Sequence, residues 1–385
     1  MGFIAGWGAE GFPSNLVSEA ARAYNCGAIA VFDSPCGPVA SVVVQVLRSI
    51  GLGSTVTGLE DAAFVEPDVG ALRGSVVTIG AYDGVHLGHR AVIAEVRRLA
   101  AERGLTSAVI TFDRHPAEIV RPESAPKLLT DLAQKLELLE STGVDTTLVV
   151  HFDEERSTET AEDFIAEIIV GALGAKVVVV GDDFHFGKDR RGNVELLRTI
   201  GRDLGAVMGF DVVGLDLFGD ELTGTAAQVG HAPKISSTRI RTLLRDGDIR
   251  KAAALLGRAY EVRGPVVHGD ARGRTLGFPT ANIAVPVEIC LPADGVYAGW
   301  YHRPDGVALP AALNLGRRPT FYADTPPYSL LEAFILDWSG DLYDEPARVE
   351  FVERLRSEMK FESIDALIAQ MGADVRKART VLGIV

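Results

Sequence analysis

Between residues 75 and 215, the spacing of the hydrophobic residues alternates between that typical of strands and that typical of helices. Short runs rich in Val, Ile and Thr, which predict strands, lie at 75–80, 107–112, 146–150, 176–181 and 211–215. Segments with helical spacing of apolar residues separate them, at 89–103, 130–141, 160–173 and 193–204. Lys176–Gly181 is almost pure valine, which is typical of a strand covered on both faces of a parallel sheet. This alternation predicts a doubly wound, Rossmann-like α/β domain that binds ligands at the carboxyl ends of its strands.

The pattern changes near Tyr260. Two short helices are expected just before it, at 237–245 and 248–256. Short apolar runs separated by Gly, Pro and Asn then follow, at 261–267, 295–301, 308–313, 329–336 and 347–351. Short strands at this spacing predict an antiparallel barrel, and the amphipathic segment 364–380 predicts a C-terminal helix. We place the first domain at 59–258 and the barrel domain at 259–385.

Residues 1–58 form an N-terminal extension to which the sequence assigns no role. The extension is rich in Gly, Ala, Ser and Val, and it carries no cluster of residues suited to catalysis. A short helix is expected at 16–24, and 39–50 fits either a helix or a strand. The segment is either a small accessory element or translated sequence upstream of the natural start.

Length, charge and cysteine content exclude several classes of protein. The 385-residue chain is long enough for two or three domains, and its formal net charge of −14 disfavours nucleic acid as a partner. Cations needed for anionic substrates must therefore be concentrated at the sites. Three cysteines without CxxC spacing argue against a disulfide framework or a zinc site. No apolar run reaches the length of about 18 residues that a bilayer span needs. We expect a cytoplasmic protein without a membrane partner.

The first candidate site follows the expected strand 75–80, in the string GAYDGVHLGH at residues 80–89. Gly80 and Gly84 allow the backbone to approach a phosphate closely, and the N-terminus of the following helix favours an anion. His86 and His89, three residues apart, can both stabilise charge that develops on an attacked phosphate. The alternative is an ordinary glycine turn with two surface histidines.

Two further clusters belong to the same domain. GDDFHFG at 181–187 follows the valine strand and contains Asp183; it suits an adenosine, or it is only an acidic loop with buried aromatic rings. ISSTRIR at 235–241 contains Ser237 and Arg241 at the start of a helix. Arginine beside hydroxyls at this position suits a phosphate, although helix capping alone explains the hydroxyls equally well. Arg239 and Arg241 cannot share one helical face.

The barrel domain carries the string GDARGRTLGFPTAN at 269–282, which includes Arg274 and Gly277. Glycines and arginines form a loop able to surround a polyphosphate, and Thr280 and Asn282 offer neutral oxygens that suit Mg²⁺ beside phosphate oxygens. The alternative is a Gly/Pro-rich barrel turn. NLGRRPTF at 314–321 is a second such turn and contains Arg317. Glu332 lies among apolar residues, either facing outward by alternation or serving as a general base.

Together these strings resemble a known family. GxYDGxHxGH, VGDDFxFG and ISSTRIR, followed by RGRxLGFPTAN, NxGxRPTF, LExFxLD, GDLY and LRxExKF, are similar to the prokaryotic bifunctional riboflavin kinase/FMN adenylyltransferases. The resemblance runs from about Leu59 to Leu382. It implies a nucleotidyltransferase domain followed by a riboflavin kinase barrel, with ATP, riboflavin and FMN as substrates and Mg²⁺ acting with ATP. Tyr82 stands where the family usually has Phe, and Ala81 where Asn is common.

The resemblance also implies roles for single residues. In the first domain, His86 and His89 would contact the ATP phosphates, Asp183 would lie near the nucleotide, and Ser237 and Arg241 would bind pyrophosphate. Gly80, Asp83 and Gly84 would shape the phosphate-binding turn, and the TFxxHP segment would place Phe112 and His115 near the flavin. In the barrel, Thr280 and Asn282 would bind the metal–nucleotide with Arg274 and Gly277 beside it, Glu332 would be the catalytic base, and Arg317 and Phe361 would lie near the flavin.

Three alternatives remain open. A single-function riboflavin kinase would fit if the first domain had lost its activity. Another small-molecule nucleotidyltransferase would fit the HxGH string but not the appended barrel. A flavin-binding regulator would bind flavin without turnover. The sequence indicates at most a weak homo-oligomer.

Overall fold

The computed structural model describes residues 29–31, 43–47, 63–65, 74–215, 235–269, 273, 276–316 and 328–384. The helix expected at 16–24 lies outside this part of the chain, as do Arg274 and Arg317. The structure divides into two compact units, which we call unit 1 and unit 2. Unit 1 contains Met1–Tyr82, Gly88–Pro126 and Leu132–Lys234, and unit 2 contains Asp83–Leu87, Lys127–Asp131 and Ile235–Val385. The domain boundaries given above stay predictions.

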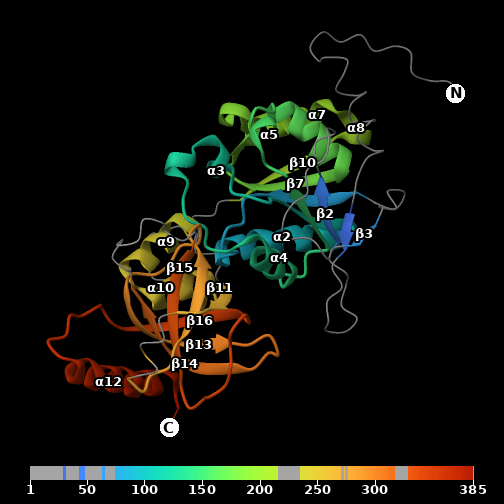
Figure 1. The fold of residues 1–385 in the computed structure, drawn as a ribbon. Coiled ribbons are helices and arrows are strands. Elements are labelled where there is room, and N and C mark those ends of the chain that lie inside the picture. The colour runs from blue at the N-terminus through green and yellow to red at the C-terminus, as the bar shows by residue number, and fades with distance from the viewer. Residues whose placement is uncertain are drawn as a thin grey trace, which may run out of the picture. The chain divides into compact units, whose positions relative to one another are not determined.

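Unit 1 is built on an eight-stranded sheet in the order β10-β7-β4-β5-β6-β2-β1-β3 (Figure 1). The strands from β10 to β2 in this order are parallel, whereas β1 pairs antiparallel with β2 and β3. The bounds are β1 (Ile29–Val31), β2 (Val43–Leu47), β3 (Ala63–Val65), β4 (Ser75–Ile79), β5 (Thr106–Phe112), β6 (Thr146–Val150), β7 (Ala175–Gly181) and β10 (Asp211–Leu215). The expected segment 39–50 therefore contains a strand rather than a helix.

Helices connect the strands from β4 to β10 in chain order. They are α2 (Leu87–Arg103), α3 (Pro116–Val120), α4 (Leu132–Glu140), α5 (Glu154–Ser157), α6 (Ala161–Phe164), α7 (Val194–Asp203) and α8 (Gly205–Met208). The helix expected at 160–173 is α6 running into a π-helix, η2 (Ile165–Ala172). Short elements complete the unit: η1 (Pro122–Ser124), η3 (Lys188–Arg190) and the hairpin of β8 (His185–Phe186) with β9 (Gly192–Asn193).

Alternate side chains of the valine strand β7 enter two different cores. Val177 and Val179 pack with Val92 and Val96 of α2 on one face of the sheet. On the other face, Val178 and Val180 pack in a second cluster with residues of α6, η2 and α7, including Phe164, Ile165, Ile168 and Leu197. Because β7 is covered on both faces, its sequence has no polar alternation. The predicted doubly wound α/β architecture is confirmed.

Unit 2 contains a closed six-stranded antiparallel barrel in the order β11-β12-β15-β14-β13-β16. Its strands are β11 (Tyr260–Val267), β12 (Ala281–Pro286), β13 (Gly295–His302), β14 (Ala308–Leu315), β15 (Tyr328–Ile335) and β16 (Pro346–Arg356). Large buried side chains fill the core, among them Tyr260, Tyr297, Tyr301 and Phe351. The predicted barrel is confirmed, although the hydrophobic pattern did not predict β12.

The helices α9 (Ser237–Asp246), α10 (Ile249–Leu256) and α12 (Ile364–Leu382) accompany the barrel. Ile240 and Leu244 of α9 and Ile249 and Leu256 of α10 belong to the same apolar cluster as the barrel interior. The predicted C-terminal helix, α12, is attached through the ion pair of Arg356 with the buried Asp374 at 2.7 Å. Within the described ranges, no helix meets the length and apolarity needed to cross a bilayer.

Candidate functional site

Unit 1 brings several predicted residues to one edge of its sheet. β7, β4, β5 and β6 are parallel neighbours, so their carboxyl ends lie side by side. Gly80 follows β4, Phe112 ends β5, and Asp183 is an exposed residue of the loop after β7. This is the edge at which ligands bind in open α/β sheets.

Phe112 and His115 lie at the end of β5 and the start of α3. The ring of Phe112 packs edge-on against Phe152 with centroids 5.4 Å apart. His115 caps α3, since its Nδ1 accepts a hydrogen bond from the backbone of Ala117 at 3.1 Å. The neutral ring therefore carries its hydrogen on Nε2. Lys135 holds this turn by donating to the carbonyl of Phe112 at 2.6 Å.

The buried side chain of Tyr82 has a polar partner. Its hydroxyl forms a hydrogen bond of 2.9 Å with Thr78, and burial raises the pKa of the phenol far above its ordinary value. The Tyr82 ring also packs edge-on against His89 of α2, with centroids 4.9 Å apart. The ring thus fixes the orientation of one of the two predicted catalytic histidines.

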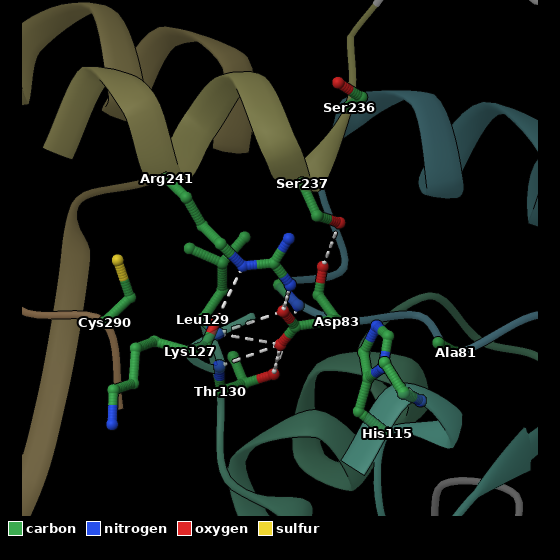
Figure 2. Close-up of polar contacts among 12 residues, drawn as sticks. Ala81, Asp83, His115, Lys127, Leu129, Thr130, Ser236, Ser237, Arg241 and Cys290 are labelled. Carbon is green, nitrogen blue, oxygen red and sulfur yellow. Dashed lines mark hydrogen bonds and ion pairs between the residues drawn. The ribbon is translucent and has the colours of Figure 1, made fainter. Parts of the chain in front are cut away.

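Asp83 is the centre of a hydrogen-bonded cluster in unit 2 (Figure 2). Its buried carboxylate accepts from the backbone of Leu129 at 2.8 Å and of Thr130 at 3.1 Å, and it forms an ion pair with Arg241 of α9. The Nε of Arg241 donates to the carbonyl of Lys127 at 2.6 Å. Two protein partners therefore bind the guanidinium that the sequence assigned to pyrophosphate.

The two serines at the start of α9 make different contacts, and the two arginines there differ in exposure. Ser236 is the N-cap and accepts from the backbone of Arg239, whereas the hydroxyl of Ser237 donates to the carbonyl of Asp83 at 2.9 Å (Figure 2). Arg239 is exposed and Arg241 is buried, which confirms that these two side chains occupy different faces. Ser237 and Arg241 thus both bind the turn that contains Asp83.

Replacing Asp83 with alanine is expected to destabilise unit 2 by about 3–5 kcal/mol, because Arg241 would be left as an uncompensated buried charge. Denaturant unfolding followed by tryptophan fluorescence tests this, since Trp300 and Trp338 belong to unit 2. Asp211→Ala is the control, because the Arg103–Asp211 ion pair is exposed and lies in unit 1. Equal unfolding midpoints for wild type and Asp83→Ala would contradict the prediction.

His86 is buried two residues beyond Gly84. The pKa of His86 is lowered to about 4, chiefly by burial and also by the charges of Arg258 and Arg241, while a backbone hydrogen bond opposes this shift. The imidazole is therefore neutral at physiological pH. It can give a hydrogen bond to a phosphate oxygen but contributes no formal positive charge.

The depressed pKa of His86 predicts a pH dependence. The unfolded chain binds more protons than the folded one between the two pKa values, about 4 folded and 6.5 unfolded, so this group lowers the free energy of unfolding as pH falls through that window. Proton NMR of the imidazole, assigned with His86→Gln, should show no titration in the range of an ordinary histidine. A midpoint near 6.5 would refute the assignment.

The barrel brings three polar residues into one row. Asn282 of β12 and Asn314 of β14 both lie opposite Glu332 of β15 in the strand register. The amide of Asn314 donates to the Glu332 carboxylate at 3.3 Å. Glu332 is half-buried between the fully buried Leu331 and Ala333, so it points away from the barrel interior as strand alternation requires. The row places amide oxygens and a carboxylate together.

Glycines allow the chain to pack closely beside this row. A Cβ on Gly269 would collide with the amide of Asn282, and a Cβ on Gly273 would lie 2.3 Å from the carbonyl oxygen of Phe278. Gly277, with φ +85°, is exposed. Arg356 of β16 follows the same register, since both it and Asn314 lie opposite Val296 of β13, and its guanidinium lies 5.8 Å from the centroid of the Phe361 ring. Outside the undescribed stretches, no group of three His, Cys, Asp or Glu is arranged to hold a metal.

Comparisons with known proteins match both halves of the chain. A FAD synthetase family model matches residues 69–221, and a riboflavin kinase family model matches 256–382. Two relatives named bifunctional riboflavin kinase/FMN adenylyltransferase, from Bacillus subtilis and Escherichia coli K12, are each 37% identical. The first alignment covers 79% of this chain and 91% of the relative, and the second covers 81% and 94%. The chain belongs to the bifunctional riboflavin kinase/FMN adenylyltransferase family.

A solved structure supports the fold of this family member. A crystal structure described as a macrolide-efflux protein from Streptococcus pneumoniae is 31% identical, with a TM-score of 0.67 over 80% of this chain and 94% of that one. The efflux activity belongs to the description of that protein and is not carried to this chain.

The structure of this family member contains two contacts that the sequence did not predict. Asn314 was part of a quoted string, but its contact with Glu332 depends on strand register. Asp113 follows β5, and its buried carboxylate bonds Nδ1 of His151, after β6, at 2.6 Å. An acidic residue and a histidine after two successive strands were a signal that could have suggested this second contact.

Proposed function

We propose that this family member makes FAD from riboflavin in two ATP-dependent steps. The observation that carries the proposal is that one chain matches the FAD synthetase and riboflavin kinase models in tandem, with relatives aligned across both. The barrel phosphorylates riboflavin to FMN. The α/β half adenylylates FMN to FAD and releases pyrophosphate.

In the first step, the ribityl 5′-hydroxyl of riboflavin attacks the γ-phosphorus of ATP, and ADP leaves. We assign Glu332 as the base that takes the hydroxyl proton, with Asn314 orienting its carboxylate through the 3.3 Å hydrogen bond. We assign Thr280 and Asn282 to the nucleotide and its phosphates. Positioning of the two reactants supplies much of the rate.

We assign Mg²⁺ as the cofactor that binds together with ATP. The donor set fits it, because Asn282, Glu332 and Thr280 offer only oxygen ligands, and Mg²⁺ is usually held by a few protein oxygens together with phosphates. Bound there, the ion would neutralise charge on the phosphates. Arg274, Gly277, Arg317 and Phe361 keep their proposed places around nucleotide and flavin.

In the second step, a phosphate oxygen of FMN attacks the α-phosphorus of ATP, and pyrophosphate leaves. The attacking oxygen is already anionic, so no base is required. We assign His86 and His89 as hydrogen-bond donors to the phosphates, and the low pKa of His86 makes it a neutral donor. Gly80, Gly84 and Asp183 are assigned to the nucleotide, Phe112 and His115 to the flavin, and Ser237 and Arg241 to the departing pyrophosphate.

We propose the partners and the cellular location of the enzyme from its substrates and its composition. ATP, riboflavin and FMN are the only partners we assign, with neither nucleic acid nor membrane. Use of ATP and the sparse cysteines support a cytoplasmic location. A homo-oligomer, if formed, is weak.

A product assay tests the function. The purified chain is incubated with riboflavin, ATP and Mg²⁺, and flavins are separated over time by chromatography. FMN should form first and FAD should follow. FMN alone would support a single-function kinase, and no new flavin would support a flavin-binding regulator.

A further inference from the structure

The turn before His86 is held in an unfavourable backbone conformation. Gly84 has φ +84°, which glycine tolerates, but Val85 has φ +36°. A β-branched residue with positive φ is a genuine outlier, and such strain persists only where neighbouring groups hold it. Val85 is also fully buried. The groups that bind this turn therefore determine where His86 lies.

Arg258 binds the carbonyls of this turn. It lies in the connection between α10 and β11, and its Nη2 donates to the carbonyl of Gly84 at 2.8 Å. Its Nη1 lies 3.5 Å from the carbonyl of Val85, a longer and weaker contact. A hydrogen bond from a guanidinium is about twice as strong as one between neutral groups. Arg258 thus contacts Gly84 and Val85, two consecutive residues with positive φ.

The backbone around Arg258 also packs closely on the turn. A Cβ on Gly257 would lie 2.5 Å from Cδ2 of Leu87, and a Cβ on Gly84 would lie 3.5 Å from Cδ2 of Leu256. Leu256, the last residue of α10, and Gly257, the residue after it, therefore lie against the two ends of the segment Gly84–Leu87. This packing places the connection that carries Arg258 next to the turn.

The two sides of the turn are held by different arginines. Arg241 binds the carboxylate of Asp83, and Arg258 binds the carbonyls that follow it. Both lie close enough to lower the pKa of His86, with Arg258 contributing more than Arg241. Arg258 therefore acts on the geometry and on the charge state of the histidine.

We propose that Arg258 is a positioning residue for FMN adenylylation, which holds the Gly84–Val85 turn and thereby places His86. The inference rests on the proposed function and deepens it. Arg258 belongs to the segment that matches the riboflavin kinase model, whereas the turn belongs to the segment that matches the FAD synthetase model. Adenylylation thus depends on a side chain supplied by the kinase segment.

The test compares Arg258→Met and Arg258→Lys in the full chain. Methionine keeps an apolar stem but removes the donors and the charge, and we expect kcat for FAD formation from FMN to fall about 100-fold. KM for ATP should change much less, because the variant misplaces His86 without removing a residue assigned to the nucleotide. Lysine restores one charged donor to the Gly84 carbonyl and should recover part of the rate. Riboflavin phosphorylation should be unchanged.

Arg250→Gln is the matched control. Arg250 lies on α10 of the same unit, is exposed and pairs with Glu353, so its replacement should leave both activities at the wild-type level. Full FAD formation by Arg258→Met would overturn the proposal, and so would an equal loss of both activities, which would indicate a general folding defect. Failure of the wild type to convert FMN to FAD would instead overturn the proposed function on which the inference rests.

Discussion

Glu332→Gln is expected to slow riboflavin phosphorylation by about 10²–10⁴-fold, the range over which a general base contributes. Glutamine has the same shape, and its carbonyl can still accept the hydrogen bond from Asn314, so the row of Asn282, Glu332 and Asn314 should persist. The amide cannot take the proton of the 5′-hydroxyl. FMN formation from riboflavin and FAD formation from FMN are measured separately, and only the first should fall.

Glu350→Gln is the control for this change. Glu350 lies on β16 of the same barrel and pairs with His302 at 3.3 Å, in a strand pair that does not include Glu332. Its replacement should leave phosphorylation unchanged. If Glu332→Gln turned over riboflavin as fast as the wild type, Glu332 would not be the base, and water or a substrate phosphate would have to accept the proton.

The double variant His86→Ala with His89→Ala is expected to lose FAD formation while retaining FMN formation. Removal of one donor to a developing oxyanion typically costs about 10²–10³-fold in kcat, and here both donors are removed. The loss arises because two anionic substrates must approach each other, and without the imidazoles their repulsion is less well compensated. Conversion of FMN to FAD and of riboflavin to FMN is followed by chromatography.

His302→Ala provides the comparison, since His302 lies on β13 and pairs with Glu350 in the barrel. It tests whether loss of a histidine as such affects the assay. Rapid FAD formation by the double variant would remove both histidines from the mechanism. A parallel loss of FMN formation would show instead that the substitutions had damaged unit 2, to which His86 belongs.

The local sequence pattern was sufficient to predict a strand or helix where burial alone determines the residue type. The valine run of β7 reflects its two covered faces, and it was recognisable without any contact information. β12 was missed because its short alternation contains the polar Asn282 and directly follows a Gly/Pro-rich string. The π-helix η2 could not be predicted, since its apolar sequence is equally compatible with an α-helix.

The candidate site was predictable in its residue types but not in their contacts. Hydroxyls and arginines at the start of α9 indicated phosphate chemistry, yet the structure pairs Arg241 with Asp83, 158 positions away in sequence. The spacing of hydrophobic residues along the chain does not indicate which distant residues will form such a pair. The same holds for Asn314 beside Glu332, which depends on the register of β14 with β15. Sequence pattern therefore located the strings that carry function, whereas tertiary structure decided which side chains bind one another.

The assignment of Asp83–Leu87 to unit 2 has a consequence for synthesis on the ribosome. This turn is translated early, but Arg241 and Arg258, which bind it, are translated long after the strands β4 to β10. A nascent chain can complete the parallel sheet while the turn before His86 still lacks both arginines. The turn that we assign to adenylylation is therefore held by both arginines only after Arg258 has been synthesised, and shorter nascent chains lack these contacts.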